Sequence, residues 1–193
     1  IVQSTTFFYG NSRVMADLFD LKREGFFYSR LANPTVDALE KRVAALEGGV
    51  CGIGCASGMS AVLLTAMTLC EAGDNIVTAS EIYGGTFNLF SSTLKKFGIQ
   101  ARFFDVDAPA EVIDALIDEK TKFVFAETIA NPAVAVLDFE KVSAVCKKHG
   151  VLFVVDNTLA TPVLCRPLEW GADIVIHSTS KYMDGHAAAL GGM

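Results

Sequence analysis

Val151-Leu152-Phe153-Val154-Val155-Asp156 is a continuous apolar run that ends in a carboxylate. A strand with one face in water alternates apolar and polar residues, whereas a strand buried on both faces is apolar throughout. The run therefore predicts a strand inside a covered sheet. The other expected strands lie near residues 75–79, 100–104, 122–126 and 173–177, and helical patterns lie between them, near 58–70, 85–97, 109–118 and 139–149. This alternation predicts an α/β fold with three layers and a mainly parallel sheet.

Two reactive residues fall at the carboxyl ends of predicted strands. Asp156 ends the run quoted above, and Lys181 follows Ile174-Val175-Ile176-His177-Ser178-Thr179-Ser180. Ligands of such sheets bind beyond the carboxyl ends of the strands. Alone, each residue would be an ordinary strand terminus. Together they are the two protein groups that pyridoxal 5'-phosphate (PLP) requires, a lysine for the Schiff base and an aspartate that keeps the pyridine nitrogen protonated. We expect the Lys181 ammonium to be desolvated there.

A turn rich in small residues, Gly54-Cys55-Ala56-Ser57-Gly58-Met59-Ser60, precedes the predicted helix at Ala61–Leu69. The N–H groups of Gly58 and Met59 and the Ser57 hydroxyl could donate to a phosphate. The alternative is a tight turn in which Ser57 is only the helix N-cap. A dinucleotide site is a weaker possibility: Gly52-Ile53-Gly54 begins like G-x-G-x-x-G, but the third glycine position is Ser57.

Other polar residues follow predicted strand ends. The Tyr83 ring could lie on a flat heteroaromatic cofactor and its phenol could transfer a proton, or the ring could be a lid on the core. Asn131, before Pro132, could bind a polar ligand group or belong to a plain turn. Ser178 and Ser180 could donate to a phosphate or satisfy the local backbone. For His177 we favour a structural role.

The N-terminal part of the chain has a different pattern. Residues 1–30 are predicted to be irregular. Asn33-Pro34 predicts the N-cap and first residue of a helix that runs to about Glu47 and ends at Gly48-Gly49. The apolar stripe of this helix consists of Val36, Leu39, Val43 and Leu46. We therefore divide the chain into an arm with a first helix, residues 1–49, and an α/β domain, residues 50–193.

Composition limits the class of protein. The chain has 193 residues, of which 51% are hydrophobic and 20% charged, and its net charge is −6. These values are typical of a globular domain, and the lack of a Lys/Arg-rich run argues against nucleic acid as the main partner. No run of about eighteen apolar residues predicts a membrane helix, and no secretory signal is visible. Five cysteines without C-x-x-C pairs predict buried, reduced thiols in a cytosolic protein, with no metal site.

The chain resembles the cysteine/methionine-metabolism family of PLP-dependent enzymes along its whole length. The stretches that carry the resemblance are Tyr28-Ser29-Arg30-Leu31-Ala32-Asn33-Pro34-Thr35, Ala56-Ser57-Gly58-Met59, Tyr83-Gly84-Gly85-Thr86, Glu127-Thr128 with Asn131-Pro132, Val155-Asp156-Asn157-Thr158 and His177-Ser178-Thr179-Ser180-Lys181-Tyr182. The resemblance implies the large domain of the fold type I PLP-dependent transferases, the aspartate aminotransferase-like fold. Two further stretches, Ala16–Lys22 and Tyr83–Phe90, look like the O-acetylhomoserine sulfhydrylase branch.

The resemblance also implies roles. Lys181 would carry the cofactor and move protons, Asp156 would pair with the pyridine nitrogen, and Tyr83 would stack on the ring. The remaining cofactor-binding residues would be Ser57, Gly58, Met59, Asn131, Ser178 and Ser180, with Tyr28 and Arg30 supplied to the phosphate of a neighbouring subunit. The implied assembly is a homotetramer built of dimers with shared active sites. The implied substrates are an amino acid and sulfide, in methionine and cysteine biosynthesis.

Several alternatives and departures remain. Methionine γ-lyases and cystathionine γ-synthases use the same residues, although a cysteine commonly replaces Gly85 in the γ-lyases. A non-catalytic nucleotide-binding α/β module using Gly52–Gly58 is the alternative from another class. Ser180 stands where threonine is usual, and Ala187-Ala188-Ala189 where many relatives have a Gly-rich turn. Relatives continue for about as many residues again, so the resemblance implies that residues 50–193 are a PLP-binding domain without the smaller C-terminal domain.

Overall fold

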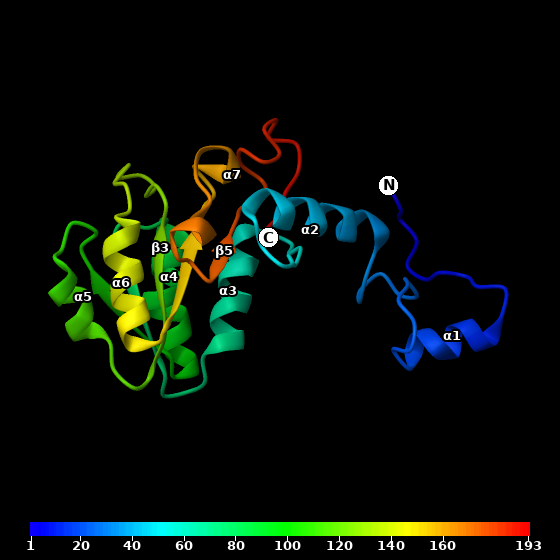
Figure 1. Ribbon diagram of the computed structural model, residues 1–193, viewed down its shortest axis with the longest axis horizontal. Coiled ribbons are helices and arrows are strands. Elements are labelled where there is room, and N and C mark those ends of the chain that lie inside the picture. The colour runs from blue at the N-terminus through cyan, green and yellow to red at the C-terminus, as the bar shows by residue number, and fades with distance from the viewer.

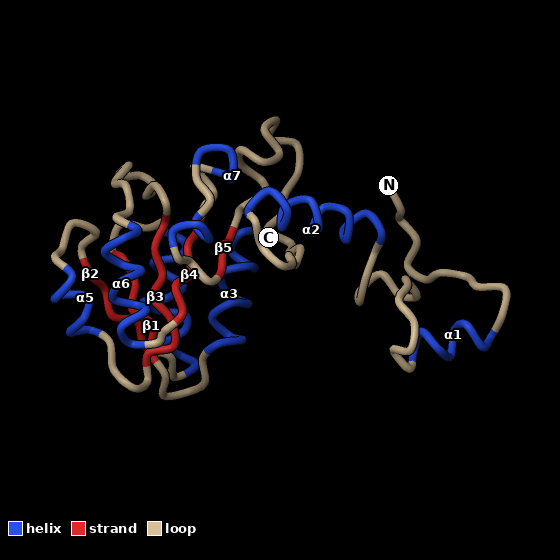
Figure 2. The backbone as a smooth tube through the Cα atoms, in the orientation of Figure 1, coloured by secondary structure: helices blue, strands red, loops and turns tan.

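A five-stranded parallel sheet forms the centre of the structure, a computed structural model that describes residues 1–193. The strands lie in the order β2-β1-β3-β4-β5, and every neighbouring pair is parallel (Figure 2). Their bounds are β1 (Asn75–Ala79), β2 (Gln100–Phe104), β3 (Thr121–Glu127), β4 (Leu152–Asp156) and β5 (Ile174–Ile176). All five predicted strands are confirmed. β1, β3 and β4 are mostly buried between the helical layers, whereas the edge strands β2 and β5 are only partly buried.

Helices cover both faces of the sheet. On one face α5 (Ala110–Leu116) and α6 (Phe139–His149) lie side by side, and on the other α3 (Gly58–Leu69) contacts α4 (Gly84–Asn88) (Figure 1). The predicted three-layer architecture is therefore confirmed. The single helix predicted near 85–97 is wrong in detail: α4 continues as a π-helical turn over Leu89–Thr93 and a 3-10 turn over Leu94–Phe97. Ser91, Ser92 and Thr93 are weak helix formers, which fits this break.

The first 49 residues contain more helix than predicted. As expected, α2 (Pro34–Glu47) starts at the Asn33 cap, whose side chain accepts from the Thr35 N–H at 2.9 Å, and it ends at Gly48 in a left-handed conformation. However, residues 1–30 are not wholly irregular, because α1 (Ser12–Phe19) forms behind an Asn11 N-cap. Two short helical turns, α7 (Thr161–Leu164) and the 3-10 turn Pro167–Trp170, were also not predicted.

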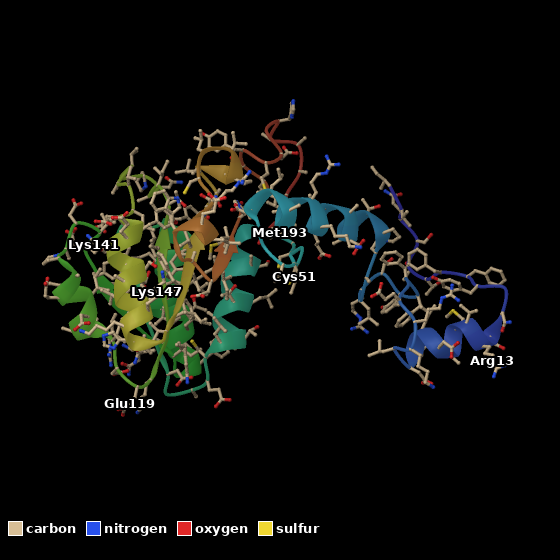
Figure 3. All side chains as sticks on the ribbon, in the orientation of Figure 1. Arg13, Cys51, Glu119, Lys141, Lys147 and Met193 are labelled. Atoms are coloured by element: carbon tan, nitrogen blue, oxygen red, sulfur yellow. The ribbon has the colours of Figure 1, made fainter.

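The N-terminal arm, residues 1–33, runs away from the α/β body beyond α2 (Figure 1). No residue before Ala61 belongs to the main buried core. In the apolar stripe of α2 only Val43 is buried, whereas Val36, Leu39 and Leu46 are 41–46% exposed. Figure 3 shows Arg13 of the arm at the opposite end of the molecule from Lys141 and Lys147 of the body. The arm therefore packs on itself, around the buried Leu18, and not on the core of the α/β body, and much of the α2 stripe faces solvent.

The last residues close the gap between β5 and the turn before α3. Met193 and His177 exchange two backbone hydrogen bonds, each 3.0 Å long, and Gly192 and Cys55 exchange two of 2.8 and 2.9 Å. A Cβ atom on Gly192 would lie 2.1 Å from the Ser57 carbonyl oxygen, so only glycine allows this approach. The segment thereby places the residues after β5 beside the start of α3.

The cysteines only partly match the prediction. All five are free, but only Cys70 and Cys146 are buried; Cys51 is exposed, and Cys55 and Cys165 are partly exposed. The prediction of five buried thiols is wrong because Cys51, Cys55 and Cys165 lie in loops outside the core. Burial raises the pKa of the Cys146 thiol to about 12, so this group stays protonated. None of the helices is long and apolar enough to cross a membrane.

Candidate active site

The candidate site lies where β3, β4 and β5 end next to one another. In the parallel register Glu127 of β3 pairs with Asp156 of β4, and Asp156 pairs with Ile176 of β5. Side chains of adjacent residues in register project to the same face of a sheet. Asp156 is therefore the central group of the row, with Glu127 on one side and the segment leading to Lys181 on the other.

Asp156 offers one carboxylate oxygen to a ligand. Its Oδ1 accepts hydrogen bonds from the backbone N–H of Thr158, at 2.9 Å, and from the Thr158 hydroxyl. Oδ2 accepts no hydrogen bond from the protein and is not among the buried atoms that lack a partner. Burial raises the pKa of the Asp156 carboxyl, while the bonds from Thr158 and the charge of His177 oppose this rise. A desolvated carboxylate with a free oxygen suits a cationic partner such as a protonated pyridine nitrogen.

The start of α3 forms an anion site beside this row. Gly58 and Met59 are the first two helical residues, so their N–H groups have no acceptor within the helix. Gly58 packs directly on Ser178: a Cβ atom placed on Gly58 would lie 2.6 Å from the Ser178 Cβ. The Ser178 hydroxyl makes no hydrogen bond within the protein. Two backbone donors and one hydroxyl thus come together at a helix N-terminus, the arrangement that binds phosphate.

Two of the predicted phosphate ligands are engaged locally. The Ser57 hydroxyl accepts from the Ser60 N–H at 3.1 Å, as the N-cap alternative anticipated. The Ser180 hydroxyl accepts from the Gly191 N–H at 2.9 Å and lies 3.2 Å from the Gly191 carbonyl oxygen. Both residues border the anion site, but their hydroxyls already have partners within the chain.

The Tyr83 side chain is half-exposed beyond the end of β1. With an exposed fraction of 49%, the residue is open to a ligand on one side. Its ring lies against Gly85, where an added Cβ atom would be 2.5 Å from Tyr83 Cε1 and 3.3 Å from Met59 Sδ. Tyr83 is therefore close to the first turn of α3, and its ring occupies the space that a side chain at position 85 would need.

Glu127 is a site residue whose role was not predicted. It is 7% exposed, and its two oxygens accept the backbone N–H groups of Tyr83, at 2.7 Å, and of Asn131, at 3.0 Å. The pKa of the Glu127 carboxyl is raised to about 7, mainly by burial; the hydrogen bonds from the Tyr83 and Asn131 N–H groups oppose the rise, and the charge of Asp156 contributes to it. Glu127 thus fixes the two turns that carry Tyr83 and Asn131. The sequence contained one signal for this role, because Glu127 ends an apolar run just as Asp156 does.

Lys181 is exposed, which corrects the expectation of a desolvated ammonium. Its backbone N–H donates to the Ser178 carbonyl at 3.2 Å, and its side chain has no ion-pair partner. The physical reason is that no other part of the chain covers most of residues 181–190, which lie mainly at the surface beyond the sheet edge. The side chain of Asn131 is likewise exposed, with no hydrogen bond of its own.

Tyr28 and Arg30 contact each other but not the other site residues. The Arg30 guanidinium carbon lies 5.0 Å from the centre of the Tyr28 ring. Both belong to the arm that extends away from the body (Figure 1). The possible dinucleotide motif, Gly52-Ile53-Gly54, is not preceded by a strand. It therefore lacks the structural context that dinucleotide binding requires.

Comparisons with known proteins identify the family of the chain. A family model described as "Cys/Met metabolism PLP-dependent enzyme" matches residues 1–193. A homocysteine/cysteine synthase of Kluyveromyces lactis is 47% identical over 194 residues, which cover 100% of this chain and 44% of that protein. An O-acetyl-L-homoserine sulfhydrylase of Leptospira meyeri is 46% identical over 193 residues, which cover 100% of this chain and 43% of that protein.

A solved structure is also similar to this chain. It is described as a putative O-acetylhomoserine (thiol)-lyase from Campylobacter jejuni, with N'-pyridoxyl-lysine-5'-monophosphate. It matches with a TM-score of 0.94 at 45% identity, and the match covers 100% of this chain and 47% of that one. The chain thus spans less than half the length of these relatives. The likeness confirms the predicted fold type I domain, and the free Asp156 oxygen and the donors at the start of α3 fit the cofactor of the matched family.

We expect Glu127→Gln to change how stability depends on pH. The folded-state pKa of about 7 lies above the ordinary 4.5, so the folded protein binds this proton more tightly than the unfolded chain. The free energy of unfolding therefore falls as pH rises between these two values. Gln does not titrate. The free energy of unfolding of the wild type minus that of the variant should therefore fall by roughly 1–3 kcal/mol between about pH 5 and pH 8. Urea titrations of cofactor-free protein measure this difference.

The control for this experiment is Glu119→Gln, which removes an exposed carboxylate. This change should not alter how the free energy of unfolding depends on pH. A Glu127→Gln difference that stays constant or grows with rising pH would contradict the assignment of a raised pKa.

Gly58→Ala should weaken PLP binding about 5- to 100-fold, because the new methyl group would force Ser178 away from the start of α3 at a cost of about 1–3 kcal/mol. Titration of cofactor-free protein with PLP, followed by absorbance, measures the affinity. Gly10→Ala is the control, since a Cβ atom at Gly10 meets no other atom within 4 Å. Unchanged affinity in a folded Gly58→Ala protein would show that the phosphate lies elsewhere.

Proposed function

Because the chain belongs to the Cys/Met metabolism family of PLP-dependent enzymes, we propose that it is the cofactor-binding part of an O-acetylhomoserine sulfhydrylase. The proposed reaction is a γ-replacement that converts O-acetylhomoserine and sulfide, or a thiol, into homocysteine and acetate, in methionine and cysteine biosynthesis. The proposal rests on sequence identity: over its whole length the chain is 46–47% identical to proteins named for this chemistry. The residues of the candidate site have the chemical groups that this reaction requires.

PLP, when bound, supplies an electron-withdrawing ring that stabilises negative charge on the substrate carbons. Lys181 Nζ would hold the cofactor covalently and carry protons to and from the substrate α- and β-carbons. Asp156 Oδ2 would hold the proton on the pyridine nitrogen. The Tyr83 ring would stack on the cofactor, and its hydroxyl would assist proton transfer near the γ-carbon.

The same segments would fix the cofactor's position. The N–H groups of Gly58 and Met59 and the Ser178 hydroxyl would bind the phosphate, with Ser57 and Ser180 supporting the two turns. Asn131 would hydrogen-bond the ring substituents from the turn that Glu127 holds.

One contact favours a sulfhydrylase over a methionine γ-lyase. A Cβ atom at position 85 would lie 2.5 Å from Tyr83 Cε1, so the Tyr83 ring would have to shift if the cysteine common at this position in γ-lyases replaced Gly85. The nucleotide-binding module has no such support, because no strand leads into Gly52.

The proposed reaction is tested by product analysis of the holoenzyme with O-acetylhomoserine, with and without sulfide. We expect homocysteine and acetate in equal amounts, only when sulfide is present. Release of ammonia and a 2-oxo acid without sulfide would identify a γ-lyase and contradict the proposal.

Borohydride reduction of the holoenzyme followed by peptide mapping should place the pyridoxyl label on Lys181. Lys181→Ala should lose both the label and almost all activity, because no other group replaces the covalent link. A label on Lys147 or Lys148, which lie on α6, would refute the assignment.

We further propose that the protein is a homotetramer of dimers with shared active sites, located in the cytoplasm. The arm supports the sharing of sites between subunits, because it extends from the body with Phe8 and Leu21 85–93% exposed, and α2 continues this exposed apolar surface. Docking on a second copy would cover this surface. It would also bring the Arg30 guanidinium to the phosphate of the neighbouring site.

Hybrid oligomers test whether sites are shared. Chains with Arg30→Ala and chains with Lys181→Ala should each be inactive, and unfolding and refolding them together should restore about a quarter of the activity, since in a twofold dimer half the sites of each hybrid regain both residues. Refolding each variant alone is the control. If mixing restores nothing while hybrids form, each chain builds its own site and the proposal fails.

A further inference from the structure

The Thr158 hydroxyl joins the two strand ends on which the candidate site is built. Thr158 follows β4 and Ser178 follows β5, each two residues past a pair that is in register, Asp156 and Ile176. The Thr158 hydroxyl donates to Asp156 Oδ1 and accepts the Ser178 N–H at 2.8 Å. One oxygen atom therefore contacts both the residue proposed for the pyridine nitrogen and a residue proposed for the phosphate.

The partners fix the direction of both hydrogen bonds. A backbone N–H can only donate, so the Thr158 oxygen accepts from Ser178, and the single proton of the hydroxyl is left for the Asp156 carboxylate. A hydroxyl that accepts one bond donates the next more strongly, because hydrogen bonds in a chain polarise one another. The backbone N–H of Thr158 also donates to Asp156 Oδ1, at 2.9 Å. Two donors on one oxygen hold the carboxylate in one orientation and leave Oδ2 for a ligand.

A local turn does not account for these contacts. An aspartate often accepts the N–H of the residue two positions ahead, which ends a strand without any further role. The bond between Ser178 and Thr158, however, joins residues 20 positions apart. It also replaces a bond of the sheet: in a regular parallel ladder the Ser178 N–H would donate to the Asn157 carbonyl. That carbonyl instead accepts the Thr161 N–H at 2.9 Å, so without the Thr158 hydroxyl the Ser178 N–H would lose its acceptor.

Ser178 extends the effect of Thr158 to two further parts of the site. Its Cβ atom lies against Gly58 at the start of α3, where an added Cβ atom would be 2.6 Å away. Its carbonyl accepts the Lys181 N–H at 3.2 Å. A displacement of Ser178 would therefore disturb both the anion site and the turn that carries Lys181.

We propose that Thr158 is a positioning residue for the cofactor: its hydroxyl aligns Asp156 with the pyridine nitrogen and, through Ser178, aligns the phosphate donors with the phosphate. Thr158 acts through these two neighbours, and no covalent bond forms or breaks at it. The inference rests on the proposed function only in that Asp156 faces the pyridine nitrogen and Ser178 the phosphate. Loss of this one hydroxyl should therefore weaken both ends of the cofactor site.

The test uses titration calorimetry to compare two ligands of the cofactor-free protein, PLP and the analogue in which carbon replaces the ring nitrogen. In wild type, PLP should bind more tightly than the analogue. In Thr158→Ala the analogue, which depends on the phosphate end, should bind about threefold more weakly, the effect of one neutral hydrogen bond. PLP should lose about tenfold more than the analogue, because it also depends on a hydrogen bond to the charged Asp156. Thr158→Ser keeps the hydroxyl and should bind both ligands as wild type does.

The dependence of PLP affinity on pH is a second readout. Burial raises the pKa of the Asp156 carboxyl, and the hydrogen bonds from the Thr158 hydroxyl and N–H oppose this rise. Thr158→Ala loses the hydroxyl bond, so the pKa of Asp156 should rise further. On acidification, PLP affinity should then begin to fall at a higher pH than in wild type, whereas Thr158→Ser should follow the wild-type profile.

Thr128→Ala is the matched control. The Thr128 hydroxyl also lies just past a strand end and is buried, but it donates to Asn157 Oδ1, at 2.8 Å, and makes no hydrogen bond to Asp156 or Ser178. This variant should lower stability and leave the affinity ratio of the two ligands unchanged. Thr158→Val is a second deletion of the hydroxyl. It leaves no space for a water molecule in place of the hydroxyl, and it should lower the affinity ratio as Thr158→Ala does.

The outcomes separate this inference from the proposed function. Equal losses for PLP and for the analogue in the folded Thr158→Ala and Thr158→Val proteins would overturn the inference, because Thr158 would then have no effect through Asp156. A loss for PLP with an unchanged affinity for the analogue would overturn it as well, because the effect would not reach the phosphate. If wild-type protein binds PLP no better than the analogue, Asp156 does not contact the ring nitrogen, and the proposed function itself is contradicted.

Discussion

The parallel pairing of β3, β4 and β5 is the constraint on which the rest of the site depends. It sets Glu127 beside Asp156 and brings the residues after Ile176 to the same edge. A shift of one residue in this register would turn Asp156 to the opposite face of the sheet and bring Asn157 forward. The continuous apolar strands, Phe123, Phe125 and Phe153 among them, are buried on both faces, and this burial holds the register.

Pairing two carboxylates in this way carries an electrostatic penalty that the surrounding groups offset. Glu127 accepts two backbone N–H groups, and Asp156 accepts two donors from Thr158. The donors belong to the turns that carry Tyr83, Asn131 and Thr158. Each carboxylate therefore orders the turn whose N–H groups bind it. The same hydrogen bonds offset the repulsion between the carboxylates and hold the turns in position.

Much of the fold followed from local sequence patterns, whereas contacts between distant segments did not. The strand at Leu152–Asp156 and the helix after Asn33-Pro34 were predictable because burial on two faces and N-terminal capping leave local patterns. For the site, Asp156 and the first turn of α3 lie where strand ends and small residues indicated. The role of Glu127 and the buried hydrogen bond between Glu47 Oε1 and His177 Nε2, 2.6 Å long, depend on how segments far apart in the sequence meet. The periodicity of a sequence carries no information about such contacts. The exposure of Lys181 depends on what covers a surface, again a non-local property.

The separation of Glu47 and His177 along the chain, 130 residues, also bears on the order of folding. Contacts between such distant residues form late, because closing a long loop has a high entropic cost that only established structure offsets. The sheet must therefore assemble before the end of α2 can dock behind β4 and β5. The strands and the edge that carries Asp156 would then form first, and the hydrogen bond between Glu47 and His177 would form last.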